Sequence, residues 1–388
     1  MSSTEPKRIF ISCAPGLEPY LARECFQIGI NLPKSTERYA RDASFHGPDE
    51  EKGGIEFNGF DRHIYLCNLY LRTASRVIVR LGEFNAVSFA ELRRKASRLE
   101  WQEVLKPSQD VVIKVTCHKS KLIHSDAVAE RIRGAIEDHF AQTIKNTKEE
   151  NKQIILVRLV NDQCTISIDS SGELLHRRGY RQAVAKAPLR ETLAAGLLLA
   201  SGWDAQSPLV DPFCGSGTIP IEAALMTRHI APSLARRFAF MDWSGYQPDL
   251  FKTLLDDARK KITPNSAMLY GSDRDRGAIE MATANAARTD VNRDIRFECH
   301  AFSDMPSFDT PGWIVTNPPY GVRVSPTKDL RDLYAAFGRM YRERFQGWKL
   351  AILCSDTALI TALDLGTPTQ SLSLNNGGLP VKFSIFNP

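Results

Sequence analysis

The stretch Asn317-Pro318-Pro319-Tyr320 carries side chains that could hold an amino group still while it reacts. An asparagine side-chain oxygen accepts a hydrogen bond but has no useful basicity. The two prolines stiffen the backbone and offer carbonyl acceptors without N–H groups, and the Tyr320 ring can lie against a flat base. We therefore predict that Asn317, Pro318, Pro319 and Tyr320 bind a planar amine, with Asn317 and the Pro318 carbonyl as acceptors. A proline-rich turn after a strand is the alternative.

A second motif joins a short strand to a glycine-rich turn at residues 207–218, Ser-Pro-Leu-Val-Asp-Pro-Phe-Cys-Gly-Ser-Gly-Thr. Glycine lets the backbone approach a ligand closely, and the helix expected at 219–226 offers free N–H groups. The third glycine of a dinucleotide fingerprint is replaced by Pro220. The motif predicts a cofactor loop of another kind.

Two further acidic residues follow apolar strands. Asp273 ends the strand expected at 268–273, where a carboxylate could accept hydrogen bonds from ribose hydroxyls. The alternative role for Asp273 is to cap the helix expected at 276–287. Asp304 follows the strand expected at 295–299, two residues after Phe302.

The strands that position these residues alternate with helices along the C-terminal half. Trp313-Ile314-Val315-Thr316 is a short apolar run that predicts a buried strand, which places Asn317 at its carboxyl end. Helices are expected at 189–201, 250–262 and 330–345, a strand at 349–354, and a hairpin at 371–386. This order predicts an α/β fold with a doubly wound sheet, whose ligands bind at the carboxyl ends of its strands.

The N-terminal half has short strands and helices in a different order. Strands are expected at 8–12, 53–57, 74–83, 110–117, 153–160 and 163–170, and helices at 16–29, 61–71, 89–101 and 126–140. The last two strands form a hairpin around Asn161-Asp162. The pattern predicts an α+β region, followed by a basic linker at 171–190.

Composition indicates a reduced, cytoplasmic protein. No apolar run approaches the ~18 residues of a membrane span, and the first eight residues are too polar for a secretion signal. The eight cysteines are scattered and none forms a Cys-x-x-Cys pair, so we expect neither a structural zinc site nor a disulfide framework. No metal and no membrane partner are expected.

Positive charge is concentrated in two places, although the net charge is only +5. Residues 72–133 contain 13 Lys/Arg and 7 Asp/Glu, and residues 174–190 contain five Lys/Arg and no acid. Such clustering fits a polyanion, although a solvated helix face can look similar. The residues expected to contact RNA phosphates are Lys119, Lys121, Arg177, Arg178, Arg181 and Arg323.

With both motifs in place, the C-terminal half resembles class I S-adenosylmethionine-dependent methyltransferases that modify amino groups. The segments 175–181 and 187–194, together with Ala14-Pro15-Gly16-Leu17-Glu18 and Asn376-Gly377-Gly378, are similar to THUMP-containing RNA guanine-N2 methyltransferases. The branch acting on large-subunit (23S) ribosomal RNA is the most similar. The resemblance implies a set of S-adenosylmethionine contacts at Asp211, Phe213, Cys214, Gly215, Gly217, Thr218, Asp273, Asp304 and Asn317.

The resemblance also implies the domain organisation. It gives a ferredoxin-like unit at 1–72, a THUMP RNA-binding domain at 73–170, the linker at 171–190, and a Rossmann-like seven-stranded methyltransferase domain at 191–388. Some relatives carry a second methyltransferase domain, and we expect the version with one.

The function implied is methyl transfer from S-adenosylmethionine to the exocyclic N2 amine of a guanine in 23S ribosomal RNA. A tRNA guanine-N2 methyltransferase would share both motifs. A DNA adenine-N6 methyltransferase would not explain the RNA-binding half, and an RNA-binding factor with a vestigial methyltransferase fold would not explain the intact motifs. The target nucleotide and the oligomeric state stay open.

Overall fold

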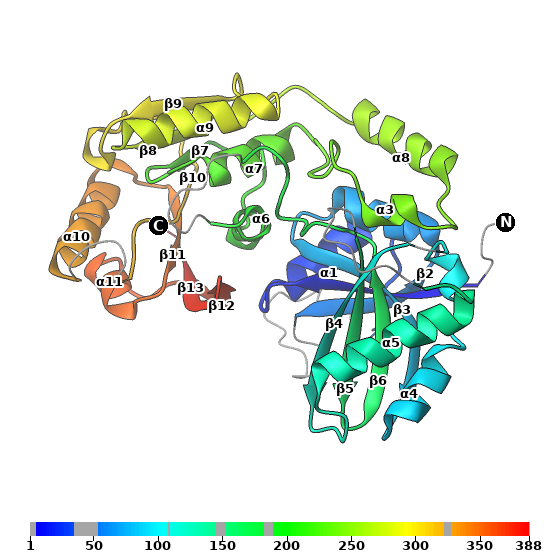
Figure 1. Ribbon diagram of the computed structural model, residues 1–388. Helices are drawn as coiled ribbons and strands as arrows, with labels where there is room; N and C mark the ends of the chain where they lie inside the picture. The colour runs from blue at the N-terminus through cyan, green and yellow to red at the C-terminus, as the bar shows by residue number, and fades with distance from the viewer. Residues whose placement is uncertain are drawn as a thin grey trace.

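The computed structural model describes residues 5–34, 53–107, 109–143, 152–181, 189–321 and 327–387 and contains two separate β-sheets (Figure 1). A six-stranded sheet forms the N-terminal half, and a seven-stranded sheet with helices on its faces forms the C-terminal half. The predicted combination of an N-terminal α+β region and a C-terminal α/β sheet is confirmed.

The N-terminal sheet is continuous from edge to edge, in the order β2-β1-β3-β6-β5-β4. Its strands are β1 (Lys7–Cys13), β2 (Gly54–Gly59), β3 (Ala74–Asn85), β4 (Val111–His118), β5 (Gln153–Val160) and β6 (Gln163–Asp169). The long strand β3 pairs with β1 along one edge and with β6 along the other. The two units expected to divide near residue 72 therefore share one sheet.

Among the described residues, the helices that accompany this sheet are α1 (Glu18–Gln27), α3 (Asp61–Tyr70), α4 (Phe89–Ala96) and α5 (Ser125–Phe140). Helix α4 ends five residues earlier than predicted, and a separate 3-10 turn follows at Trp101–Glu103. The buried Trp101 indole donates to the Ala96 carbonyl, 2.8 Å away, and so satisfies a free acceptor at the end of α4. The predicted hairpin is confirmed, with Asn161 and Asp162 both at positive φ.

The C-terminal sheet has the order β12-β13-β11-β10-β7-β8-β9. Its strands are β7 (Leu209–Asp211), β8 (Leu269–Asp273), β9 (Ile295–Cys299), β10 (Trp313–Thr316), β11 (Lys349–Cys354), β12 (Gln370–Asn376) and β13 (Leu379–Phe386). All neighbours pair in parallel except β13, which is antiparallel to β11 and β12. The strand order reverses between β7 and β10, which is where such sheets bind ligands.

The helices that the structure describes in this half are α6 (Glu191–Ser201), α7 (Thr218–Thr227), α8 (Pro248–Lys260), α9 (Arg276–Arg288), α10 (Thr327–Arg344) and α11 (Thr357–Ala362). The six-residue helix α11 was not predicted. Short 3-10 turns lie at Ala239–Asp242 and Phe302–Asp304.

The two halves pack directly on each other. A Cβ atom on Gly16, at φ +96°, would lie 2.5 Å from the Ser373 carbonyl oxygen, so only glycine lets this loop meet strand β12. Glu18 fixes the same loop by accepting from the Gly16 and Gly53 N–H groups. Arg72 reaches from the N-terminal half to the carbonyl of Leu225 in the last turn of α7 and to that of Ile230 just after the helix. The contacts place the basic half at a fixed orientation to the C-terminal sheet.

Candidate active site

The ends of strands β7 and β10 bring the two sequence motifs together. Ile314 pairs with Val210 across these strands, and the Thr316 hydroxyl donates to Asp211 Oδ1 over 2.6 Å. The residue after the strand, Asn317, therefore lies next to the start of the glycine-rich loop. Residues more than 100 positions apart in the chain therefore lie side by side at the carboxyl ends of neighbouring strands.

The glycine-rich loop is held by its backbone. Cys214 N–H donates to the Ser272 carbonyl, and Gly217 N–H donates to the Cys214 carbonyl. A Cβ atom on Gly217 would lie 2.9 Å from Ala282 Cβ in α9, whereas one on Gly215 would meet no atom within 4 Å. Gly217 therefore permits close packing of α9, and Gly215 faces space that a ligand can occupy.

The Asp273 carboxylate is fixed beside this loop. Its Oδ2 accepts from Gly215 N–H at 3.1 Å, and its Oδ1 accepts from Asp275 N–H at 3.0 Å. Helix α9 is capped by Asp275, whose side chain accepts from the Gly277 and Ala278 N–H groups. The alternative in which Asp273 serves as the helix cap is therefore wrong. Its remaining lone pairs are free to accept from hydroxyl groups.

Asp211 is buried at the centre of the site. Burial raises the pKa of its carboxyl to about 7, and the nearby Asp273 charge adds to the increase. The hydrogen bonds that Asp211 accepts from the Thr316 hydroxyl and Phe213 N–H oppose this increase in pKa. A buried carboxyl that titrates near neutrality is typical of a functional site.

Replacing Asp211 with asparagine should change how stability depends on pH. The folded-state pKa of about 7 lies above the unfolded value, so the wild-type carboxyl loses stability as pH rises from about 4 to about 7. The asparagine side chain would still accept from Thr316 and carries no charge. We expect the melting temperature of Asp211→Asn, relative to wild type, to be higher at pH 8 than at pH 5, measured by differential scanning fluorimetry. An equal difference at both pH values would contradict the raised pKa.

The Asn317 side-chain oxygen is the clearest sign of a missing partner. This Oδ1 atom is buried and accepts no hydrogen bond from any residue that the structure describes. A buried acceptor without a partner is costly, and such atoms in native proteins commonly await a ligand or water. The atom predicted to accept from an amine is therefore buried and unsatisfied among the described residues, and its role stays a prediction.

The rest of this stretch is held by residues that the sequence prediction did not include. Asn376 Nδ2, at the end of β12, donates to the Tyr320 hydroxyl over 3.1 Å. The Tyr334 hydroxyl of α10 donates to the Pro319 carbonyl over 3.4 Å. Asn376 belongs to the Asn-Gly-Gly turn already noted for its family resemblance, and that resemblance could have pointed to a role for Asn376 near the site. Nothing in the spacing pointed to Tyr334.

An aromatic cluster borders the glycine-rich loop. The Phe213 and Phe302 rings lie 5.4 Å apart, and both contact Phe337 edge to face. Asp304 is exposed on the following 3-10 turn, where Ser303 Oγ donates to its carboxylate. An apolar ligand surface is therefore provided by Phe213 and Phe302, and a cofactor contact at Asp304 stays a prediction.

The expected RNA-contacting residues fall into two groups. Lys119 and Lys121 are exposed just beyond the end of β4, and the Arg177 side chain is 64% exposed beside Glu173. These three are accessible to a polyanion. Arg323 lies outside the described residues.

Arg178 and Arg181 face inward, so their assignment to RNA contact is corrected. The Arg178 side chain is 1% exposed and pairs with the fully buried Glu222 of α7. Arg181 donates to Thr218 Oγ1 and to the Leu189 carbonyl, each over 2.7 Å. Counting charges along the linker could not show that these two arginines brace helix α7.

The described part of the chain holds no group of three or more His, Cys, Asp or Glu side chains that could bind a metal ion. Within the same residues, no helix is long and apolar enough to cross a membrane.

Comparison with known protein families divides the chain into three matched regions. Residues 178–384 match the RMKL-like methyltransferase domain, residues 86–169 the THUMP domain, and residues 40–78 the RlmL ferredoxin-like domain. The matched regions follow the predicted order of domains.

Individual relatives cover nearly the whole chain. A proposed RNA methyltransferase of Synechocystis sp. is 32% identical over 384 residues, covering 97% of this chain and 96% of the relative. The ribosomal RNA large subunit methyltransferase K/L of Syntrophotalea carbinolica is 34% identical over 98% of this chain, which spans 54% of that relative's length. The crystal structure of a proposed methyltransferase complexed with SAH superposes with a TM-score of 0.86 at 27% identity, covering 99% of this chain and 98% of that one.

Proposed function

We propose that this chain, which belongs to the RMKL-like methyltransferase family, methylates the exocyclic N2 amine of a guanine in large-subunit (23S) ribosomal RNA. The family depends on S-adenosylmethionine, and a structural relative was solved with its demethylated product, SAH. The observation that carries the proposal is the buried, unsatisfied Oδ1 of Asn317 at the end of β10.

The residues present fit the cofactor. Gly215 borders open space, and Asp273 holds a carboxylate fixed by two backbone N–H groups. Asp273 would accept from the ribose hydroxyls, and Asp211 with residues 213–218 would surround the methionine part. When bound, S-adenosylmethionine supplies an activated methyl group on a sulfonium. The remaining task of the protein is to position the amine for in-line attack.

Asn317 and its neighbours position that amine. The exocyclic nitrogen of guanine is a weak nucleophile because its lone pair is delocalised into the ring. Acceptors at Asn317 Oδ1 and the Pro318 carbonyl would orient the two N–H bonds and stabilise the positive charge that develops on nitrogen. The methylated ammonium is acidic enough to lose its proton to water, so no strong base is required. Tyr320, fixed by Asn376, would stack on the base once it has left its own stack.

The choice of guanine rests on the resemblance to THUMP-containing RNA guanine-N2 methyltransferases, and the choice of ribosomal RNA rests on the relatives and on charge. An asparagine and two prolines would hold adenine N6 or cytosine N4 equally well. The K/L-type relative is named for the large-subunit RNA, and the THUMP match indicates an RNA-binding half. A tRNA guanine-N2 methyltransferase is the second candidate, since it would use the same site.

Product analysis tests the proposal. The purified chain would be incubated with labelled cofactor and either deproteinised large-subunit RNA or bulk tRNA, followed by nuclease digestion and nucleoside mass spectrometry. We expect N2-methylguanosine from the ribosomal RNA. Label found as N6-methyladenosine, or only in tRNA, would refute the proposed substrate.

Asp273→Ala should weaken cofactor binding. The variant removes the acceptor expected to hold the ribose hydroxyls, and leaving such groups unpaired costs about 1–3 kcal/mol. Isothermal titration with SAH measures the loss, and Asp309→Ala serves as a control because Asp309 is an exposed acid in the loop before β10. Unchanged SAH affinity in Asp273→Ala would remove Asp273 from the cofactor site.

A further inference from the structure

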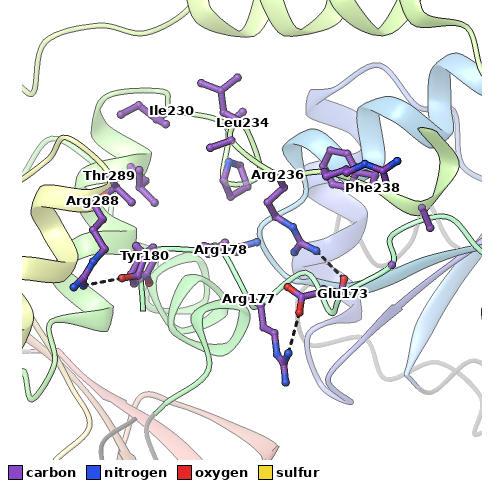
Figure 2. A pocket seen from close by; sticks show the side chains of 18 of the residues that line it. Glu173, Arg177, Arg178, Tyr180, Ile230, Leu234, Arg236, Phe238, Arg288 and Thr289 are labelled. Atoms are coloured by element: carbon purple, nitrogen blue, oxygen red, sulfur yellow. Dashed lines mark hydrogen bonds and ion pairs between the residues drawn. The ribbon is translucent and has the colours of Figure 1, made fainter. Parts of the chain in front are cut away.

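A cavity of about 850 Å³ lies between the two halves of the molecule, away from the candidate active site. It is bounded by the linker after β6, by the residues that follow α7, and by the start of β5 (Figure 2). Leu225 near the end of α7 and Arg288 at the end of α9 line it. The cofactor loop is at the opposite end of α7, about 15 Å away for a ten-residue helix.

The charges lining this cavity are unbalanced. Three carboxylates, Glu173, Asp242 and Asp290, lie among six cationic side chains, which are Lys152, Arg177, Arg178, Arg236, Arg237 and Arg288. Arg178 is already paired with the buried Glu222, which leaves five cations for three carboxylates. Clefts lined by one sign of charge concentrate ions of the opposite sign.

Arg236 and Arg288 are bound only through neutral acceptors among the described residues. Arg236 donates to the Leu174 and Glu173 backbone carbonyls, and Arg288 donates to the Tyr180 carbonyl and Asn285 Oδ1. Burial and the nearby charges of Arg178 and Arg76 lower the pKa of Arg236 to about 10, and the carboxylates of Glu173 and Asp169 oppose this shift. An anion here would add a charged acceptor to two arginines whose described hydrogen bonds go to neutral groups.

Arg177 and Arg237 can exchange partners. The Arg177 side chain is 64% exposed and pairs with Glu173, and that of Arg237 is 57% exposed and pairs with Asp242. Figure 2 shows Arg177 and Arg236 on either side of Glu173. Exposed ion pairs contribute little stability, so a phosphate can replace the carboxylate at small cost.

The geometry points to a phosphate-binding site in this cavity, which holds the backbone of the same RNA whose base enters the active site. The inference rests on the proposed RNA substrate. A polynucleotide can contact the cavity and the active site together, and the second contact then becomes intramolecular. A free mononucleotide has the same phosphate chemistry without that advantage. Both halves line the cavity, so a bound strand would bridge the RNA-binding half and the catalytic half.

The salt dependence of RNA binding tests this site, measured on variants that are expected to change binding in opposite directions. Binding of deproteinised large-subunit RNA and of bulk tRNA would be measured by fluorescence anisotropy from about 50 to 200 mM salt. The slope of log affinity against log salt is negative, and for Arg177→Gln/Arg237→Gln we expect it to become shallower by about 1–2. Each lost phosphate contact accounts for about 0.9 of the slope. Asp242→Asn should strengthen binding, since it releases Arg237. Arg259→Gln on α8, which breaks a comparable exposed pair with Asp256, should change neither quantity.

Several results would overturn the site. One is an unchanged slope in the double variant, with melting temperature and SAH affinity equal to wild type. Weaker binding by Asp242→Asn would show that the pair has only a structural role. Uridine monophosphate that competes as strongly as RNA would identify a nucleotide site instead. Binding to tRNA alone would refute ribosomal RNA as the substrate, and the slopes measured on tRNA would still test the phosphate site in the cavity. Binding to neither RNA would overturn both the proposed substrate and the phosphate site.

Discussion

Asn317→Ala is expected to lower methyl transfer by ~100-fold or more, the effect of removing one hydrogen bond made in the transition state. The Oδ1 atom that is lost is buried and has no partner among the described residues, so we expect its hydrogen bond to form only when the amine is bound. The turnover number should therefore fall, while SAH affinity stays close to wild type. Single-turnover assays at saturating RNA and cofactor measure the effect.

The same substitution gives a second, independent result. Truncating an asparagine whose side chain is hydrogen-bonded within the fold lowers the stability of the protein. Removing an unsatisfied buried acceptor should instead leave the melting temperature unchanged or slightly higher. The control is Asn376→Ala, which removes the bond to Tyr320 and leaves Asn317 in place. Its effect on turnover should be smaller than that of Asn317→Ala. Near-normal turnover in Asn317→Ala, or a large loss of stability, would contradict the assigned role.

The positions of Asp211, Asp273 and Asn317 could be predicted because each follows a short apolar strand. In a parallel sheet the carboxyl ends of the strands meet at one edge, so local patterns place distant residues together. The bond between Thr316 and Asp211 confirms this meeting. The cap of α9 was harder to assign, because Asp273 and Asp275 both precede the helix and only the backbone geometry separates them.

The pairing of β3 with both β1 and β6 could not be read from the chain. Its pattern predicts a strand, but which neighbours it takes depends on contacts about 65 and 90 residues away in sequence. The end of α4 was misplaced for a related reason. Trp101 continues the helical spacing of apolar residues, yet it folds back to bind the Ala96 carbonyl.

Charge patterning gave a mixed result in the linker. Arg177 is accessible, as expected, while Arg178 in the adjacent position is buried against Glu222. Sequence alone treats both as surface cations, since arginine is rarely buried unless paired. The partner lies 44 residues further along the chain, within a helix whose other residues are mostly apolar. Arg236 and Arg288 were not considered because both lie outside the two basic stretches, residues 72–133 and 174–190.

Arg178→Ala is expected to destabilise the folded chain by about 3–5 kcal/mol, the cost of leaving a buried carboxylate without its partner. The Arg178 and Glu222 side chains are 1% and 0% exposed, with Nε and Oε1 3.4 Å apart. Arg178 also donates to the Leu175 and Arg72 carbonyls, so the substitution opens the junction between the two halves. Urea unfolding followed by tryptophan fluorescence measures the loss.

A paired substitution separates the buried charge from the lost packing. In Arg178→Met/Glu222→Gln neither position of the pair carries a charge, and the introduced glutamine side chain can still accept from the Tyr180 hydroxyl. We expect the double variant to be more stable than Arg178→Ala, because most of the penalty comes from the unpaired carboxylate. Arg177→Ala in the adjacent position should change stability by less than about 0.5 kcal/mol, since its ion pair is exposed. If Arg178→Ala unfolds at the wild-type urea concentration but binds RNA more weakly, the predicted RNA contact is right and the structural role is wrong.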